Sequence, residues 1–133
     1  MALLIVLGCS KRGNVFSLEV GQCFEDSINL TATEVQNVNL TDCKNPHLNE
    51  VYEVTELPAG NYPLLSIERT VAEICYDAFE LYVGEIYEYS IYEIGAIWPT
   101  KESWEKANDR EITCYLYDMQ EKLKLGTAAN SGL

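Results

Sequence analysis

The sequence predicts an α+β domain in which one long helix packs across a small antiparallel sheet of about five strands, with disulfides stapling the fold. Three observations support this fold class. Short segments with apolar residues at every second position lie on both sides of one longer segment with a helical period. Clusters of proline, glycine and asparagine separate these segments. The chain has 133 residues and five cysteines, and this length suits one modest core and is too short for two.

Three expected strands precede the helix, at residues 15–24, 34–43 and 50–57. The first alternates apolar and polar side chains, which is typical of a half-buried strand. The segment KNPH after the second is expected to be a turn, because proline lacks a backbone donor and Asn-Pro disfavours a helix. In the third, the period of two places Tyr52 and Val54 on one face.

The helix is predicted over residues 67–82. Ser66 is in position to cap its start, and Gly84 is suited to end it in the left-handed conformation. The apolar positions recur at helical spacing and define one buried face: Ile67, Val71, Ile74, Cys75, Ala78, Phe79 and Tyr82.

Two further strands are expected after the helix. Residues 87–98 are rich in tyrosine and isoleucine, which favours a strand. Residues 99–110 are predicted to be a loop with a helical turn, and residues 111–119 the last strand. The closing segment GTAANSGL has no large apolar residue before its last position, so residues 120–133 are predicted to form a flexible tail.

The acidic balance of the chain limits its partners. Twenty-one acids against nine bases give a formal charge of −12, spread along the chain. Nucleic acid is excluded as a partner because the basic stripe that phosphates require is missing, and membrane contact is expected only through an anchor. The acids are expected to be a solvated surface, since no ligand ladder of the EF-hand kind supports cation binding.

No metal or cofactor is predicted. The cysteines form no C-x-x-C pair, and His47 is the single histidine, so the spacings of structural zinc sites are absent.

Four cysteines are expected to form two disulfides. Cys75 lies on the buried stripe of the helix and Cys114 on the inward face of the last strand, so packing the helix on the sheet brings them together. Cys23 and Cys43, each at the end of an expected strand, form the second candidate pair. Four cysteines allow three connectivities, and this one is favoured.

The fifth cysteine, Cys9, follows the apolar run LLIVLG and allows two interpretations. The segment VLGC resembles a bacterial lipobox, whose cysteine carries lipid as the first residue of the mature protein. The usual Lys or Arg before the apolar run is absent, so this interpretation requires a signal truncated by a late start site. The other interpretation is a short strand with a buried free thiol. Lipid attachment at Cys9 is the favoured hypothesis, with residues 1–14 as signal remnant and linker.

Five motifs occur in a fixed order: VGQCF, VNLTDCKNPHLNEVY, LPAGNYP, AEICYDAFELYVG, and SW followed by DREITC. Together they resemble the septum-formation domain of actinobacterial envelope proteins, over roughly residues 15–118. The resemblance implies an extracytoplasmic domain over residues 15–119, held at the cell surface by a membrane segment or a lipid and associated with formation of the division septum. It implies no catalytic residue. The chain departs from the family pattern between Trp104 and Arg110, where one residue is added and Asn108 replaces a usual glycine.

Three residues are candidates for a ligand or a structural role. His47 is the one side chain suited to proton transfer near neutral pH, but no nucleophile accompanies it, and a bond to a turn carbonyl is the favoured role. Arg110, which follows Asp109, is expected to pair with a local acid and fix a turn, and the alternative is that its forked donors bind an anionic ligand such as a carboxylate. Trp104 belongs to an aromatic cluster between residues 76 and 104, which suits a core and an interface equally.

The sequence therefore predicts a non-enzymatic interaction domain of the cell envelope, anchored by lipid, with protein or cell-wall partners. The alternative is a cell-wall ligand-binding domain or hydrolase that uses His47 with nearby acidic residues.

Overall fold

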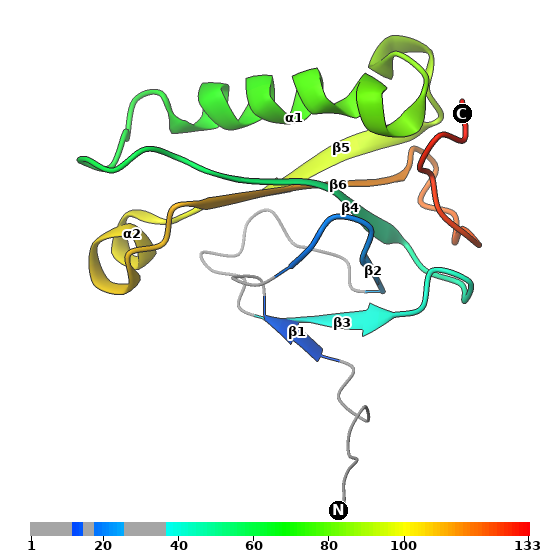
Figure 1. Ribbon diagram of the computed structural model, residues 1–133, viewed down its shortest axis with the longest axis horizontal. Coiled ribbons are helices and arrows are strands. Elements are labelled where there is room, and N and C mark those ends of the chain that lie inside the picture. The colour runs from blue at the N-terminus through cyan, green and yellow to red at the C-terminus, as the bar shows by residue number, and fades with distance from the viewer. Residues whose placement is uncertain (1–11, 15–17, 26–36) are drawn as a thin grey trace, which may run out of the picture.

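The computed structural model describes residues 12–14, 18–25 and 37–133, with one antiparallel sheet and two helices among them (Figure 1). Within these residues the sheet has six strands in the order β1-β3-β2-β4-β6-β5. The strands are β1 Arg12–Asn14, β2 Cys23–Phe24, β3 Asn37–Thr41, β4 Asn49–Glu56, β5 Tyr92–Ile97 and β6 Glu111–Asp118. The helices are α1 Ile67–Val83 and α2 Lys101–Ala107, with a short 3₁₀ helix, η3, at Tyr87–Tyr89. The α+β class with one long helix across an antiparallel sheet is confirmed in outline.

The amino-terminal part of the sheet differs from the prediction. Arg12–Asn14, expected to belong to a linker, pairs with β3. Of the strand expected at 15–24, the described residues 18–25 form a strand only at Cys23–Phe24, because a turn precedes it in which Gly21 has φ of 93° and Gln22 donates to the carbonyl of Glu19.

A β-bulge in β4 divides its side chains in a way that simple alternation does not predict. The register with β6 shifts between Val51 and Glu53, so Tyr52 is the additional residue. Tyr52 therefore packs in the core beneath α1, whereas Val54 packs against the core on the opposite face. The prediction that these two side chains share a face is wrong.

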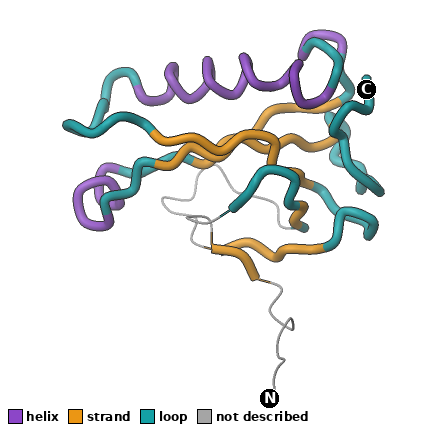
Figure 2. The backbone as a smooth tube through the Cα atoms, in the orientation of Figure 1, coloured by secondary structure: helices purple, strands orange, loops and turns teal. Residues whose placement is uncertain are grey.

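Helix α1 lies across one face of the sheet (Figure 2). It packs there through a single stripe of side chains. The buried residues are spaced four apart: Ile67, Val71, Cys75, Phe79 and Val83. Gly84 ends the helix in the left-handed conformation, with φ of 85°, as predicted. The side chain of Ser66 makes no capping bond, and its backbone (φ −126°, ψ −6°) lies outside the extended conformation from which a capping side chain reaches the amides of the first turn. The predicted serine cap is wrong.

The helical turn expected within residues 99–110 is a complete short helix, α2. Thr100 and Ser103 form a reciprocal capping box at its start. Asn108 ends it with φ of 54°, a left-handed conformation that asparagine tolerates. This geometry explains how Asn108 replaces the glycine of the family pattern.

Both expected disulfides are present. Cys75 and Cys114 join α1 to β6 through sulfurs 2.02 Å apart, within the core cluster beneath the helix. Cys23 and Cys43 join β2 to the turn after β3, with sulfurs 2.08 Å apart. Neither helix of the described residues has the length and apolar character that crossing a membrane requires.

Residues 120–133 pack on the domain, where the sequence predicted a flexible tail. Their backbone amides donate to Cys43, Tyr82 and Val83 from Gly126, Asn130 and Gly132 respectively. Ala128 is fully buried in the core beneath α1. The prediction failed because backbone hydrogen bonds and one small side chain hold the segment, and neither produces an apolar pattern in the sequence.

Substitution of Gly95 tests the packing of the sheet. Tyr115 on β6 lies directly opposite Gly95, and its ring occupies the space that a Cβ atom would take. We expect Gly95→Ala to lower the free energy of unfolding by about 1–3 kcal/mol, since the buried ring must move. Urea denaturation measures the loss. In Gly95→Ala/Tyr115→Ala the two losses should not add, and full additivity would contradict the predicted overlap.

Candidate functional site

A buried carboxylate, Glu50, joins three parts of the domain. It lies on β4 and is completely buried. Four donors reach its two oxygens from α1 and from the C-terminal segment: Tyr82 Oη (2.6 Å), Thr127 Oγ1 (2.6 Å), Lys124 Nζ (2.6 Å) and the amide of Ala128 (2.8 Å). The network around Glu50 therefore satisfies a charge that burial alone would make very costly.

The hydrogen bonds decide the charge state of Glu50. Burial raises the pKa of this carboxyl, but the bonds from Lys124, Thr127, Tyr82 and Ala128 outweigh it and hold the pKa below its ordinary value of 4.5. The stabilisation that this group contributes is therefore complete above 4.5 and is lost as the pH falls through the lower pKa of the folded state.

His47 lies beside this network and is buried. Its Nδ1 is 2.8 Å from the carbonyl oxygen of Asn45, and a carbonyl only accepts, so Nδ1 carries the proton. Nε2 then accepts from Lys124 Nζ at 3.2 Å. Burial and the Lys124 charge lower the pKa of His47, against the opposing effects of the Asn45 carbonyl and of Glu50. The bond to a turn carbonyl agrees with the favoured structural role.

The cluster is not arranged as a metal site. Ligand atoms of Cys23, His47 and Glu50 lie within 4.8 Å of one another. However, Cys23 is in a disulfide and offers no thiolate, and the Lys124 ammonium already donates to the Glu50 carboxylate and to the unprotonated nitrogen of His47. Lys124 thus takes the position and the charge that a cation would have.

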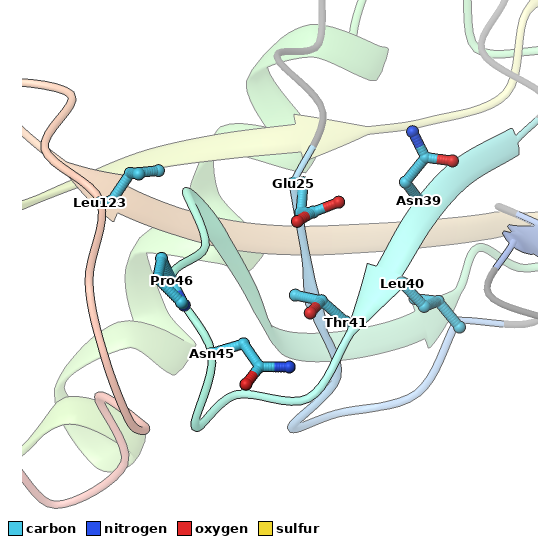
Figure 3. A pocket seen from close by; sticks show the side chains of 7 residues that line it. All are labelled: Glu25, Asn39, Leu40, Thr41, Asn45, Pro46 and Leu123. Atoms are coloured by element: carbon cyan, nitrogen blue, oxygen red, sulfur yellow. The ribbon is translucent and has the colours of Figure 1, made fainter.

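An open groove of about 490 Å³ lies over β2, β3 and the turn that precedes His47 (Figure 3). The described residues of its lining are mixed in character and include no basic side chain: Glu25, Asn39, Leu40, Thr41, Asn45, Pro46 and Leu123. A carboxylate, two amides and a hydroxyl beside proline and leucine suit a neutral or cationic ligand better than an anion. His47 does not line this groove, so the structure does not join the one histidine to a ligand-binding cavity there.

Arg110 and Trp104 fix the end of α2. The guanidinium lies over the Trp104 ring, 3.7 Å from its centroid, and Nη1 donates to the carbonyls of Trp104 and Asp109. Within the described part of the chain Arg110 makes no ion pair, so the expected pairing with a local acid is wrong. The Trp104 indole in turn donates to the carbonyl of Gly60 at 3.0 Å, which holds the loop before α1. These two candidate residues serve the fold through carbonyls and ring stacking.

The predicted aromatic cluster divides between core and surface. Tyr92 and Trp104 are buried, whereas Tyr76 and Tyr89 are exposed. Cys9, the predicted site of lipid attachment, lies outside the described residues.

Sequence reasoning missed the residues that form the network around Glu50. Lys124 and Thr127 lie in the segment predicted to be flexible, and Tyr82 was assigned only to the apolar stripe. One signal was available: a glutamate at a position of β4 that alternation places in the sheet interior requires a partner, because isolated carboxylates are rarely buried. Nothing in the sequence indicates that the partner is Lys124, 74 residues away.

Glu50→Gln tests the network. We expect a loss of about 3–5 kcal/mol in the free energy of unfolding, since the substitution leaves the Lys124 ammonium buried without a counter-charge. The matched control is Glu102→Gln, which removes an exposed ion pair with Lys106 and should cost about 0–1 kcal/mol. Equal losses in the two variants, measured by urea denaturation, would show that the buried network does not support the fold.

Arg110→Lys tests the stacking at α2. A lysine ammonium lacks the planar fork, so we expect a loss of about 1–2 kcal/mol and a red shift of Trp104 fluorescence. Arg69→Lys, in an exposed pair with Glu73, is the control and should change the free energy of unfolding by less than about 0.5 kcal/mol.

Comparison with known proteins shows which family the domain belongs to. No curated protein and no solved structure matches the chain. The family model described as septum formation matches residues 20–131. This range includes strands β2 to β6, both helices, both disulfides and the part of the C-terminal segment that binds Glu50. The resemblance found in the motifs is thereby confirmed, and the chain belongs to the septum-formation family.

Proposed function

We propose that this domain acts outside the cytoplasmic membrane as a non-enzymatic interaction module in division-septum formation. The observation that carries the proposal is the family match over residues 20–131, which includes nearly all of the described structure. The proposed anchor is a lipid on Cys9.

The two disulfides support the extracytoplasmic part of the proposal. Such bonds persist in oxidising compartments and are rare in the reducing cytosol. One of them, Cys75–Cys114, lies inside the core, where reduction would remove a link between α1 and β6.

The geometry of His47 supports the non-enzymatic part. Both ring nitrogens are engaged, one by a backbone carbonyl and one by the Lys124 ammonium, and the side chain is completely buried. A general base needs a free nitrogen within reach of substrate.

The groove is the proposed contact surface for a protein or cell-wall partner. Its polar side chains offer hydrogen bonds, and the charge of Glu25 favours a neutral or cationic group on the partner. Leu123 supplies an apolar wall from the C-terminal segment and is 63% exposed. A partner that covers Leu123 removes this apolar surface from water, which favours binding.

The test follows the full-length protein in dividing cells of its native host. We expect immunolabelled protein at the septum, and an intact mass that reports two disulfides and an acyl chain on Cys9. Cys9→Ser should abolish the acyl mass and release the protein from the membrane fraction. Protein that is uniformly cytosolic with reduced cysteines would overturn the proposal.

A pair of leucine variants tests the groove. Leu123→Glu places a charge in the groove wall and should reduce the septal fraction of the protein several-fold. Leu125→Glu is the matched control, because Leu125 is 71% exposed on the same segment and does not line the groove. Equal behaviour of the two variants would show that the groove is not the contact surface.

A further inference from the structure

The C-terminal segment, residues 120–133, is held beside β4 by a compact set of contacts centred on Lys124. Its backbone forms an antiparallel bridge with His47, with N–O distances of 3.1 and 2.8 Å. The Lys124 ammonium lies 2.6 Å from Glu50 Oε1 and 3.2 Å from His47 Nε2. One lysine thus joins the segment to a buried acid and to the single histidine of the chain.

These contacts depend on the charge of His47. In the neutral ring Nε2 accepts from the ammonium, so the cluster contains one cation and one anion. A proton on Nε2 would turn this acceptor into a donor that faces another donor at 3.2 Å. Two cations would then compete for the Glu50 carboxylate, whose oxygens already receive four hydrogen bonds.

Among the described residues, the groups in contact with the cluster include no second anion. Tyr82 of α1 donates its hydroxyl to Glu50, and the ring of Tyr92 on β5 lies 5.5 Å from Lys124 Nζ. Cys23 of β2, the remaining titratable residue type near His47, is in a disulfide. Glu50 is therefore the one negative charge that the described structure places against both bases.

We propose that protonation of His47 displaces Lys124 and releases the C-terminal segment from β4, so that residues 120–133 form an acid-sensitive latch. Glu50 then pairs with the imidazolium, and the ammonium leaves for solvent with the segment that carries it. Lys124 is already 10% exposed, so its path to water is short.

The direction of the pKa shift agrees with the geometry. Burial and Lys124 lower the pKa of His47 in the closed state, so the open state binds the proton more tightly. Closure is therefore complete above the ordinary histidine value of 6.5 and is progressively lost as the pH falls below it.

Release would also change the groove. Leu123 precedes Lys124 and forms part of the groove wall, so an open latch removes that wall. This consequence rests on the proposed function, whereas the latch itself is measured without any partner.

Hydrogen exchange of the intact oxidised protein tests the latch. The probes are the amides of Gly126, Asn130 and Gly132, which donate to Cys43, Tyr82 and Val83, with the β4–β6 ladder as internal reference. Between about pH 7.5 and about pH 5.5, after correction for intrinsic exchange rates, protection of the probe amides should fall roughly tenfold or more. Protection in the ladder should stay constant within about twofold.

Two variants and one titration make the outcome decisive. His47→Gln cannot gain the proton, so protection of the segment should be the same at both pH values. Lys124→Met should lower the protection of the segment amides at both pH values, and the protection should not depend on pH. If a variant does not fold, the NMR titration of the wild-type His47 ring must share its midpoint with the shifts of the segment amides. Separate midpoints, unchanged protection in the wild type, or an undiminished response in His47→Gln would each overturn the proposal.

Discussion

A buried carboxylate must be surrounded by donors, and this requirement organises the domain around Glu50. The four donors come from α1 and from the C-terminal segment, while the carboxylate itself is on β4. Removal of any donor leaves part of a charge unsatisfied in a region from which water is excluded. The helix end, the central strand and the last residues of the chain are therefore fixed relative to one another by one group.

The two disulfides act at different places from this network and complement it. Cys75–Cys114 ties the middle of α1 to β6 inside the main core, where apolar burial already favours the contact. Cys23–Cys43 ties the short strand β2 to the turn that leads to His47. In the chain-entropy description a loop closed by about 20 or about 40 residues contributes about 3–4 kcal/mol, so each link is a large part of the stability of a small domain.

The family assignment and the structure support each other in the C-terminal segment. The family match extends to residue 131, past the last strand, and the structure shows why a domain boundary near residue 119 is too early. Lys124, Thr127 and Ala128 supply three of the four donors to Glu50. The segment belongs to the fold because it neutralises a charge that β4 buries.

The sequence by itself determined the fold class, the position of α1 and the pairing of Cys75 with Cys114. Each depends on a period: four-residue spacing on α1 places Cys75 in the core, and two-residue spacing on β6 places Cys114 opposite it. The position of Asn108 at the end of α2 likewise follows from its own backbone preference. The tertiary structure alone decided the bulge at Tyr52, the packing of residues 120–133 on the domain and the hydrogen bonds around Glu50. These depend on hydrogen bonds between residues as far as 78 positions apart, and such bonds leave no period in the chain that forms them.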